Sequence, residues 1–178
     1  MTTEQNDCGC GGPSPSECEA AMIEMGKPAE ELKFLEPFIG TWDAEVKMWM
    51  GPGEPMVSRG VMVNDWALGG RWLRNTYKGD DNFEGSGYFG FNKVTGQFQW
   101  VWIDTMSPMV FMEVGTYDQA TRTFNTSGES LCPFAKVMLG KRSVTRIEGP
   151  DRYVMEMFRT SPGEAEVKEM EIVYTRRA

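Results

Sequence analysis

The sequence predicts an all-β protein: an up-and-down antiparallel barrel of about ten strands, preceded by one or two short N-terminal helices. The first observation behind this prediction is an alternation of residue types in GTWDAEVKMWM, residues 40–50. Charged side chains at Asp43, Glu45 and Lys47 alternate with an apolar face. The residues of that face are Trp42, Ala44, Val46, Met48 and Met50. A period of two is typical of a strand with one buried and one solvated face.

The second observation is that strand patterns recur with very short connections over the rest of the chain. The expected strands are Thr41–Met50, Val57–Trp66, Arg71–Lys78, Glu84–Phe91, Gln97–Asp104, Met109–Tyr117, Arg122–Glu129, Lys136–Ile147, Arg152–Thr160 and Glu166–Arg176. Segments such as GPGEP, GDDN and EGPD between them carry turn residues. Connections this short make neighbouring strands antiparallel, because a parallel crossover needs about a dozen residues or more. Strands in such number curl and close into a barrel, which at this size can hold one small ligand.

The N-terminal residues 1–38 differ from the expected barrel domain, residues 39–178. NDCGCGGPSPSE is rich in Gly, Pro and Ser, which is typical of an unpacked tail. Ser14 to Glu17 then fit a capping box with Pro15 at the first helical position, and Gly26 fits the end of that helix. A second short helix is expected to begin at Pro28 and to end at Pro37.

Composition excludes several classes of function. The formal net charge of -8 leaves no basic surface for a nucleic-acid partner. No apolar run approaches the roughly 20 residues of a membrane span, and MTTEQND has no signal-peptide pattern, so a cytoplasmic location is expected. The chain contains no histidine, which excludes His-ligated haem, His-ligated zinc and triads that need a histidine. We therefore expect no cofactor, and binding rather than catalysis.

Several motifs together resemble a known family. FIGTW at the first strand and VYTR at the last are similar to the signature of calycins, the lipocalins and fatty-acid-binding proteins. LEPFIGTWDAEVKMWMGPG, GRWL, WIDTM, GTYD, SVTRI and MEIVYTR resemble the bacterial domain-of-unknown-function family 1579, over about Leu32 to Arg176. The resemblance implies a calycin-like barrel in which Trp42 plugs one end and Arg176 packs across it as a cation–π partner. It implies no particular activity.

The candidate ligand-binding residues follow from the expected inward faces: Met48, Trp102, Asp104, Met112, Arg142 and Tyr174. The methionines, 14 in the chain, suit either an adaptable cavity or a plastic solid core. Asp104 ends an aromatic strand face, where it is either an acid or base at the mouth or a turn residue before TMSP. Arg142 either meets a ligand carboxylate or pairs with Glu156 or Glu171 on a neighbouring strand.

These residues favour a binding protein for a small apolar or amphipathic molecule with one acidic end. The first alternative is an enzyme of the isomerase or cyclase type that uses Asp104, Glu156 or Tyr174 for proton transfer. The second is a soft-metal or redox response through the N-terminal cysteines Cys8, Cys10 and Cys18, with Met22 and Met25 on the same helix face as Cys18. No complete set of metal ligands is predicted from the sequence.

Overall fold

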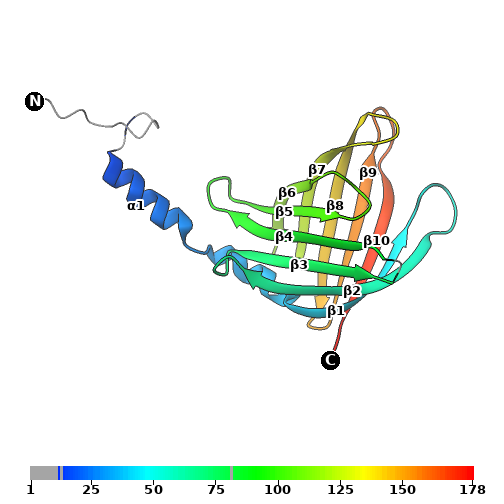
Figure 1. Cartoon of the computed structure of the whole chain (residues 1–178), viewed down its shortest axis with the longest axis horizontal. Coiled ribbons are helices and arrows are strands. Elements are labelled where there is room, and N and C mark those ends of the chain that lie inside the picture. The colour runs from blue at the N-terminus through cyan, green and yellow to red at the C-terminus, as the bar shows by residue number, and fades with distance from the viewer. Residues whose placement is uncertain (1–11, 13, 81) are drawn as a thin grey trace, which may run out of the picture.

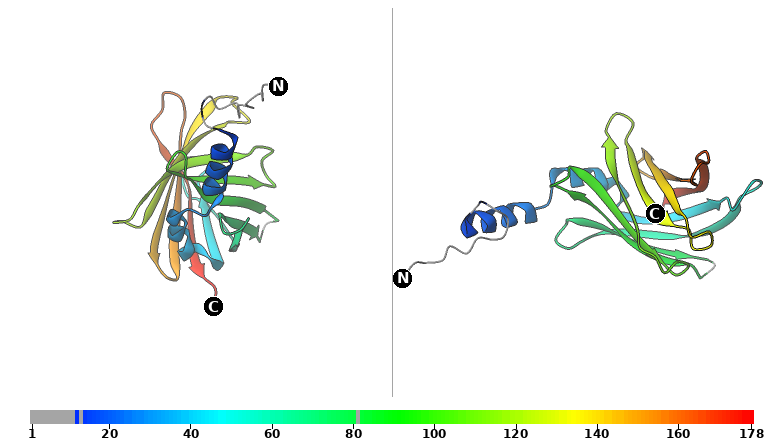
Figure 2. Two further views of the ribbon diagram at one scale, coloured as in Figure 1. Left: turned by 90° about the vertical axis from the view of Figure 1, so that its left-hand side faces the viewer. Right: turned by 90° about the horizontal axis from the view of Figure 1, so that it is seen from above.

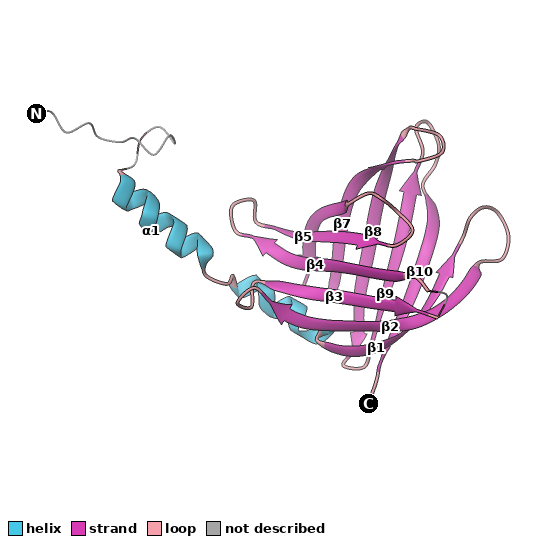
Figure 3. Cartoon of the chain, in the orientation of Figure 1, coloured by secondary structure: helices cyan, strands magenta, loops and turns pink. Residues whose placement is uncertain are grey.

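The computed structural model shows a closed antiparallel barrel with helical segments before it (Figures 1 and 3). It describes residues 12, 14–80 and 82–178. Within them each strand pairs with the next in sequence, and β10 pairs with β1 to close the barrel. The strands are β1 Gly40–Met48, β2 Met56–Ala67, β3 Trp72–Gly79, β4 Glu84–Asn92, β5 Gln97–Asp104, β6 Phe111–Asp118, β7 Thr123–Leu131, β8 Met138–Gly149, β9 Arg152–Thr160 and β10 Val167–Arg176. The predicted all-β up-and-down barrel of ten strands is confirmed.

Two helical segments precede the barrel. The α-helix α1, Pro15–Gly26, begins with the predicted capping box: the Ser14 side chain accepts from the Glu17 amide, and the Glu17 carboxylate accepts from the Ser14 amide. None of its residues is buried, and it extends away from the barrel in the right-hand view of Figure 2, with its C-terminal end held by Lys93, which donates to the Glu24 carbonyl at 2.9 Å. The second segment, η1 Glu30–Phe38, is a 3-10 helix that runs one residue past Pro37, where we had expected it to end. Its apolar side chains Leu32, Leu35 and Phe38 are buried, and their packing fixes this short helix at the barrel.

One end of the barrel is closed by Trp42, whose side chain is 1% exposed. Its indole N–H donates to the Phe38 carbonyl at 2.7 Å, and the Arg176 guanidinium lies 4.0 Å from its ring centre. Arg176 also donates to the carbonyls of Ile39 at 2.7 Å and Pro37 at 2.9 Å. Gly40, with φ +126, leaves room for this guanidinium, because a Cβ there would lie 2.6 Å from Arg176 Nη1. Strand β10 is thereby joined to the segment that enters β1.

The half of the barrel next to this plug is filled by aromatic side chains. Phe124 contacts Phe38, Phe89 and Phe98 at centroid distances of 5.7, 5.1 and 5.0 Å. Tyr153 packs edge-on against Trp42 at 4.7 Å. Tilted and edge-to-face pairs of this kind interlock ring faces with ring edges. The closed half is therefore a packed core, and open space is concentrated nearer the other end.

Candidate functional site

A cavity of ≈ 350 Å³ occupies the barrel interior away from the Trp42 plug. Strand β1 locates it, because the chain runs from Trp42 at the closed end to Val46 and Met48, which line the cavity. A smaller space of ≈ 70 Å³ lies among the closed-end aromatics. Both spaces share the lining residues Met62, Trp100, Trp102, Met155 and Tyr174. The predicted interior is thus hollow in its outer half and nearly filled in its inner half.

Most of the cavity wall is apolar and rich in methionine. Strands β1, β2, β9 and β10 contribute alternate side chains, in the order expected for inward-facing positions. The contributing residues are Val46, Met48, Met62, Met155, Met157, Met170 and Ile172. Unbranched thioether side chains adapt to irregular apolar shapes, so this wall can accommodate ligands of differing outline.

Two glycines on β4 create room for the aromatic side of the cavity. Gly85 and Gly87 lie opposite Asp104 and Trp102 in the β4–β5 register. A Cβ on either glycine would overlap with the Trp102 ring. The indole therefore lies against the barrel wall and leaves the centre open. The sequence GSG, which weakens a strand on propensity alone, is explained by this close approach.

Asp104 lies at the mouth, where it lines the cavity and also organises a turn. Its carboxylate accepts from the backbone amides of Met106 and Ser107, both at 2.9 Å. The Trp102 indole N–H donates to its other oxygen at 3.1 Å. Three N–H donors already surround this carboxylate, so the turn-forming role that the sequence suggested is present.

A buried polar cluster on β6, β7 and β8 escaped the sequence prediction. Glu113 is 4% exposed, lines the cavity, and accepts hydrogen bonds from Thr126 Oγ1 at 2.6 Å and Ser143 Oγ at 3.0 Å. The strand register brings these residues together. Glu113 pairs with Gly128, which lies two residues from Thr126, and Thr126 pairs with Ser143 on β8. A buried carboxylate needs such donors, since an unpaired one would be strongly destabilising.

Among the described residues, the cation that lines the cavity is Lys141, and the prediction of Arg142 was wrong. Lys141 lines the cavity and donates to Glu169 Oε1 at 2.6 Å, with the two side chains 17% and 19% exposed. Arg142 has the opposite parity on β8, so it points outward. There it forms a bidentate pair with Glu166 at 2.6 and 2.9 Å and lies 4.1 Å from the Phe158 ring centre. Its partner is thus neither Glu156 nor Glu171.

Met112 lines the cavity, as predicted, but from its rim. Met112 is 56% exposed on the outward parity of β6, and only its position at the rim places it beside the cavity. The inward positions on this strand are Phe111 and Glu113, which line the cavity. Tyr174, by contrast, is 3% exposed and lines both spaces. Its burial raises the pKa of its hydroxyl above that of an exposed tyrosine.

Comparison with known proteins assigns the sequence to a family. The profile of the family described as "Protein of unknown function (DUF1579)" matches residues 27–176. The chain belongs to this family. Among solved structures, "Crystal Structure of Rv2717c from M. tuberculosis" is 19% identical with a TM-score of 0.65, over 85% of this chain and 100% of that one. This likeness shows the fold alone. "Structure of EF1p2_mFAP2b bound to DFHBI" is 8% identical with a TM-score of 0.42, over 83% and 100%. No curated protein matches.

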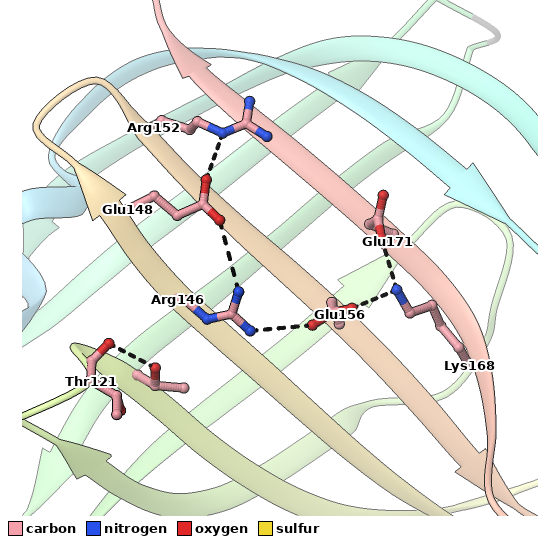
Figure 4. A network of polar contacts seen from close by, with 8 residues as sticks. Thr121, Arg146, Glu148, Arg152, Glu156, Lys168 and Glu171 are labelled. Atoms are coloured by element: carbon pink, nitrogen blue, oxygen red, sulfur yellow. Dashed lines mark hydrogen bonds and ion pairs between the residues drawn. The ribbon is translucent and has the colours of Figure 1, made fainter.

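Glu156, one of the residues suggested for acid–base chemistry, lies on the outer surface of this DUF1579 barrel. Glu156 has outward parity on β9 and lies 3.6 Å from Arg146 Nη2, and Lys168 bridges it to Glu171 (Figure 4). Glu148 extends this outer network: it lies 3.8 Å from Arg146 Nη1, and its other oxygen lies 2.6 Å from Arg152 Nε (Figure 4). Of the three side chains proposed for proton transfer, Asp104 and Tyr174 border the cavity and Glu156 does not.

The N-terminal cysteines fall largely outside the described residues. Cys8 and Cys10 belong to residues 1–11, which the structure does not describe, and Cys18 is half-buried on α1. Met22 and Met25 on the same helix are exposed. No helix in the described part of the DUF1579 chain has both the length and the apolar character to cross a membrane.

Proposed function

We propose that this DUF1579 barrel binds a small apolar or amphipathic molecule in the cavity behind its mouth. The observation that carries the proposal is the ≈ 350 Å³ space lined by methionine, aromatic and aliphatic side chains with a few polar groups. Ligand cavities are typically about 300–1,000 Å³ and have this mixture of apolar wall and sparse polar groups. Apolar burial would supply most of the affinity, at about 25 cal/mol per Å².

The rim of the barrel supports the same proposal. Exposed apolar side chains gather on the loops and strand ends around the mouth, where an apolar ligand would enter. They include Met50, Met56, Val57, Met106, Val110, Met112, Leu131, Phe134, Met138 and Val167. A ligand that moves from an apolar source into the cavity would thus meet apolar surface before it reaches the interior.

The experiment uses paired substitutions on one strand. Ile172 lines the cavity, whereas the next residue, Val173, has outward parity on β10. Ile172→Trp should fill the space, and Val173→Trp adds the same ring outside the barrel. A neutral fluorescent probe, N-phenyl-naphthylamine, is titrated against wild type and both variants, with urea unfolding as the check on folding.

We expect the probe to bind wild type and Val173→Trp with similar affinity, and Ile172→Trp at least about tenfold more weakly. If the folded wild-type protein does not bind the probe, or if both variants bind it as wild type does, the cavity is not a ligand site. A loss of the same size in both variants would mean that the effect is not specific to the interior.

A further inference from the structure

The charged groups around the cavity are mostly acidic. Among the described residues that line it are three half-buried or buried carboxylates, those of Asp104, Glu113 and Glu169, a fourth, Glu129, that is exposed at the rim, and one ammonium group, that of Lys141. These groups lie in or beside an apolar space, where charges interact more strongly than in water. The net charge of these groups therefore determines which charge on a ligand head group is favourable inside the barrel.

The inward cation is already paired. Lys141 Nζ lies 2.6 Å from Glu169, and Arg159 lies 3.8 Å from the other oxygen of the same carboxylate. The Lys141 side chain is only 17% exposed, so little solvent screens this pair. A ligand carboxylate could reach Lys141 only in competition with Glu169, and its charge would add to those around it.

Glu113 is a buried carboxylate that has unused hydrogen-bond acceptor positions. Its two hydrogen-bond donors are the neutral hydroxyls of Thr126 and Ser143, and in the described part of the chain it has no Lys or Arg nitrogen within 4.0 Å. A carboxylate offers about four lone-pair sites, so two hydroxyls leave acceptor positions unused. The side chain is more than nine-tenths buried and borders the cavity, which places those positions where a ligand group can use them.

We propose that the ligand of this cavity carries a basic head group, a protonated amine, and that Glu113 receives it. The inference rests on the proposed function and replaces the acidic end that the sequence suggested. An ammonium group donates to a carboxylate through a charge-assisted hydrogen bond, the strongest kind available to these residues. The apolar body of the ligand lies against the methionine wall.

The test compares three compounds with one apolar body and different ends: octylamine, octanol and octanoate. Each displaces N-phenyl-naphthylamine from wild type at neutral pH and low salt. We expect octylamine to bind at least about tenfold more tightly than octanoate, with octanol between them, as one charge-assisted hydrogen bond predicts.

Two isosteric variants assign the preference to a residue. Glu113→Gln removes the charge and retains hydrogen bonding, because an amide can accept from one hydroxyl and donate to the other. It should weaken octylamine by about tenfold and leave octanol unchanged. Glu45→Gln removes the same charge from the outer face, where Glu45 lies 3.1 Å from Arg59, and should change neither compound.

The outcomes separate this inference from the proposed function. If the neutral probe does not bind, both fail. If the probe binds and the three compounds compete equally, or octanoate competes best, the barrel is a ligand site and the basic head group is refuted. An unchanged octylamine preference in folded Glu113→Gln would refute the assignment to Glu113. Should that variant fail to fold, the wild-type series still decides the head group.

Discussion

Removal of the Arg176 guanidinium should destabilise the barrel more than any neighbouring surface change. The variant Arg176→Met keeps an unbranched side chain over Trp42 and removes the donors. The guanidinium donates to the carbonyls of Ile39, Pro37 and Pro150 at 2.7, 2.9 and 2.9 Å. It also lies 4.0 Å from the centre of the Trp42 ring. These contacts join the last strand to the chain that enters the first one.

The expected loss follows from those contacts. Hydrogen bonds to a charged group contribute about 1.5–3 kcal/mol each in favourable cases, and a partly desolvated cation–π contact about 1 kcal/mol. The Arg176 side chain is 31% exposed, so water replaces part of what is lost. We therefore expect a loss of about 3 kcal/mol in the free energy of unfolding, or about 6–12 °C in Tm for a domain of this size.

The adjacent Arg177 provides the matched control. It pairs with Asp43 on the outer surface, with side chains 51% and 55% exposed, and Arg177→Met should cost about 0–1 kcal/mol. Urea unfolding followed by tryptophan fluorescence and circular dichroism measures both variants. Equal losses for Arg176→Met and Arg177→Met would refute the view that the guanidinium holds the barrel end together.

Three further outcomes are expected. Arg142→Met should leave the affinity for the neutral probe unchanged, because the guanidinium points outward; a tenfold loss would restore Arg142 to the site. Gly85→Ala should push the Trp102 ring into the cavity and weaken binding of the probe, because a Cβ there would lie 2.1 Å from Trp102 Cζ2; unaltered binding in that variant would show that the ring can move elsewhere. Burial raises the pKa of both Tyr153 and Tyr174. Because the folded pKa lies above the unfolded one, their stabilisation is complete below about pH 10 and is lost as pH rises beyond it. In an alkaline titration their phenolate absorbance should therefore appear only with unfolding, and early ionisation of all tyrosines would contradict the burial argument.

The strands and their order could be predicted because alternation and turn residues are local signals. The face of β8 could not, because Val144 and Ile147 fall on opposite faces, so apolar residues favour neither Lys141 nor Arg142 as the inward side chain. Position 113 was missed for a different reason. A glutamate next to Met112 suggests an outward side chain, and the hydroxyls that stabilise it inside come from Thr126 and Ser143 on two other strands. Long-range partners of this kind leave no local trace in a sequence.

A β-bulge on β10 explains why the sequence did not predict Glu169 inside the barrel. The β9–β10 register shifts between Lys168 and Met170, so that the consecutive residues Glu169 and Met170 both line the cavity. Strict alternation would place only one of them inside. The inward Glu169 is the partner of Lys141, and without the bulge that ammonium group would lack its 2.6 Å contact. An irregularity in one strand therefore sets the charge balance of the cavity.

The two halves of the interior have different physical tasks. At the closed end, Asn64 donates to the Phe38 carbonyl at 2.9 Å and Asn75 donates to Asn64 at 2.7 Å, so a buried polar chain adds directional bonds to the aromatic packing. Satisfied buried networks of this kind favour one arrangement over its alternatives. The outer half instead uses methionine, which adapts its shape at little cost. A substitution such as Met157→Leu in the outer half should therefore change which molecules fit while the closed end maintains the fold. Because the packing of the closed end and the methionine wall of the outer half are separate layers of side chains, the shape of the cavity can change while the packing that stabilises the barrel is retained.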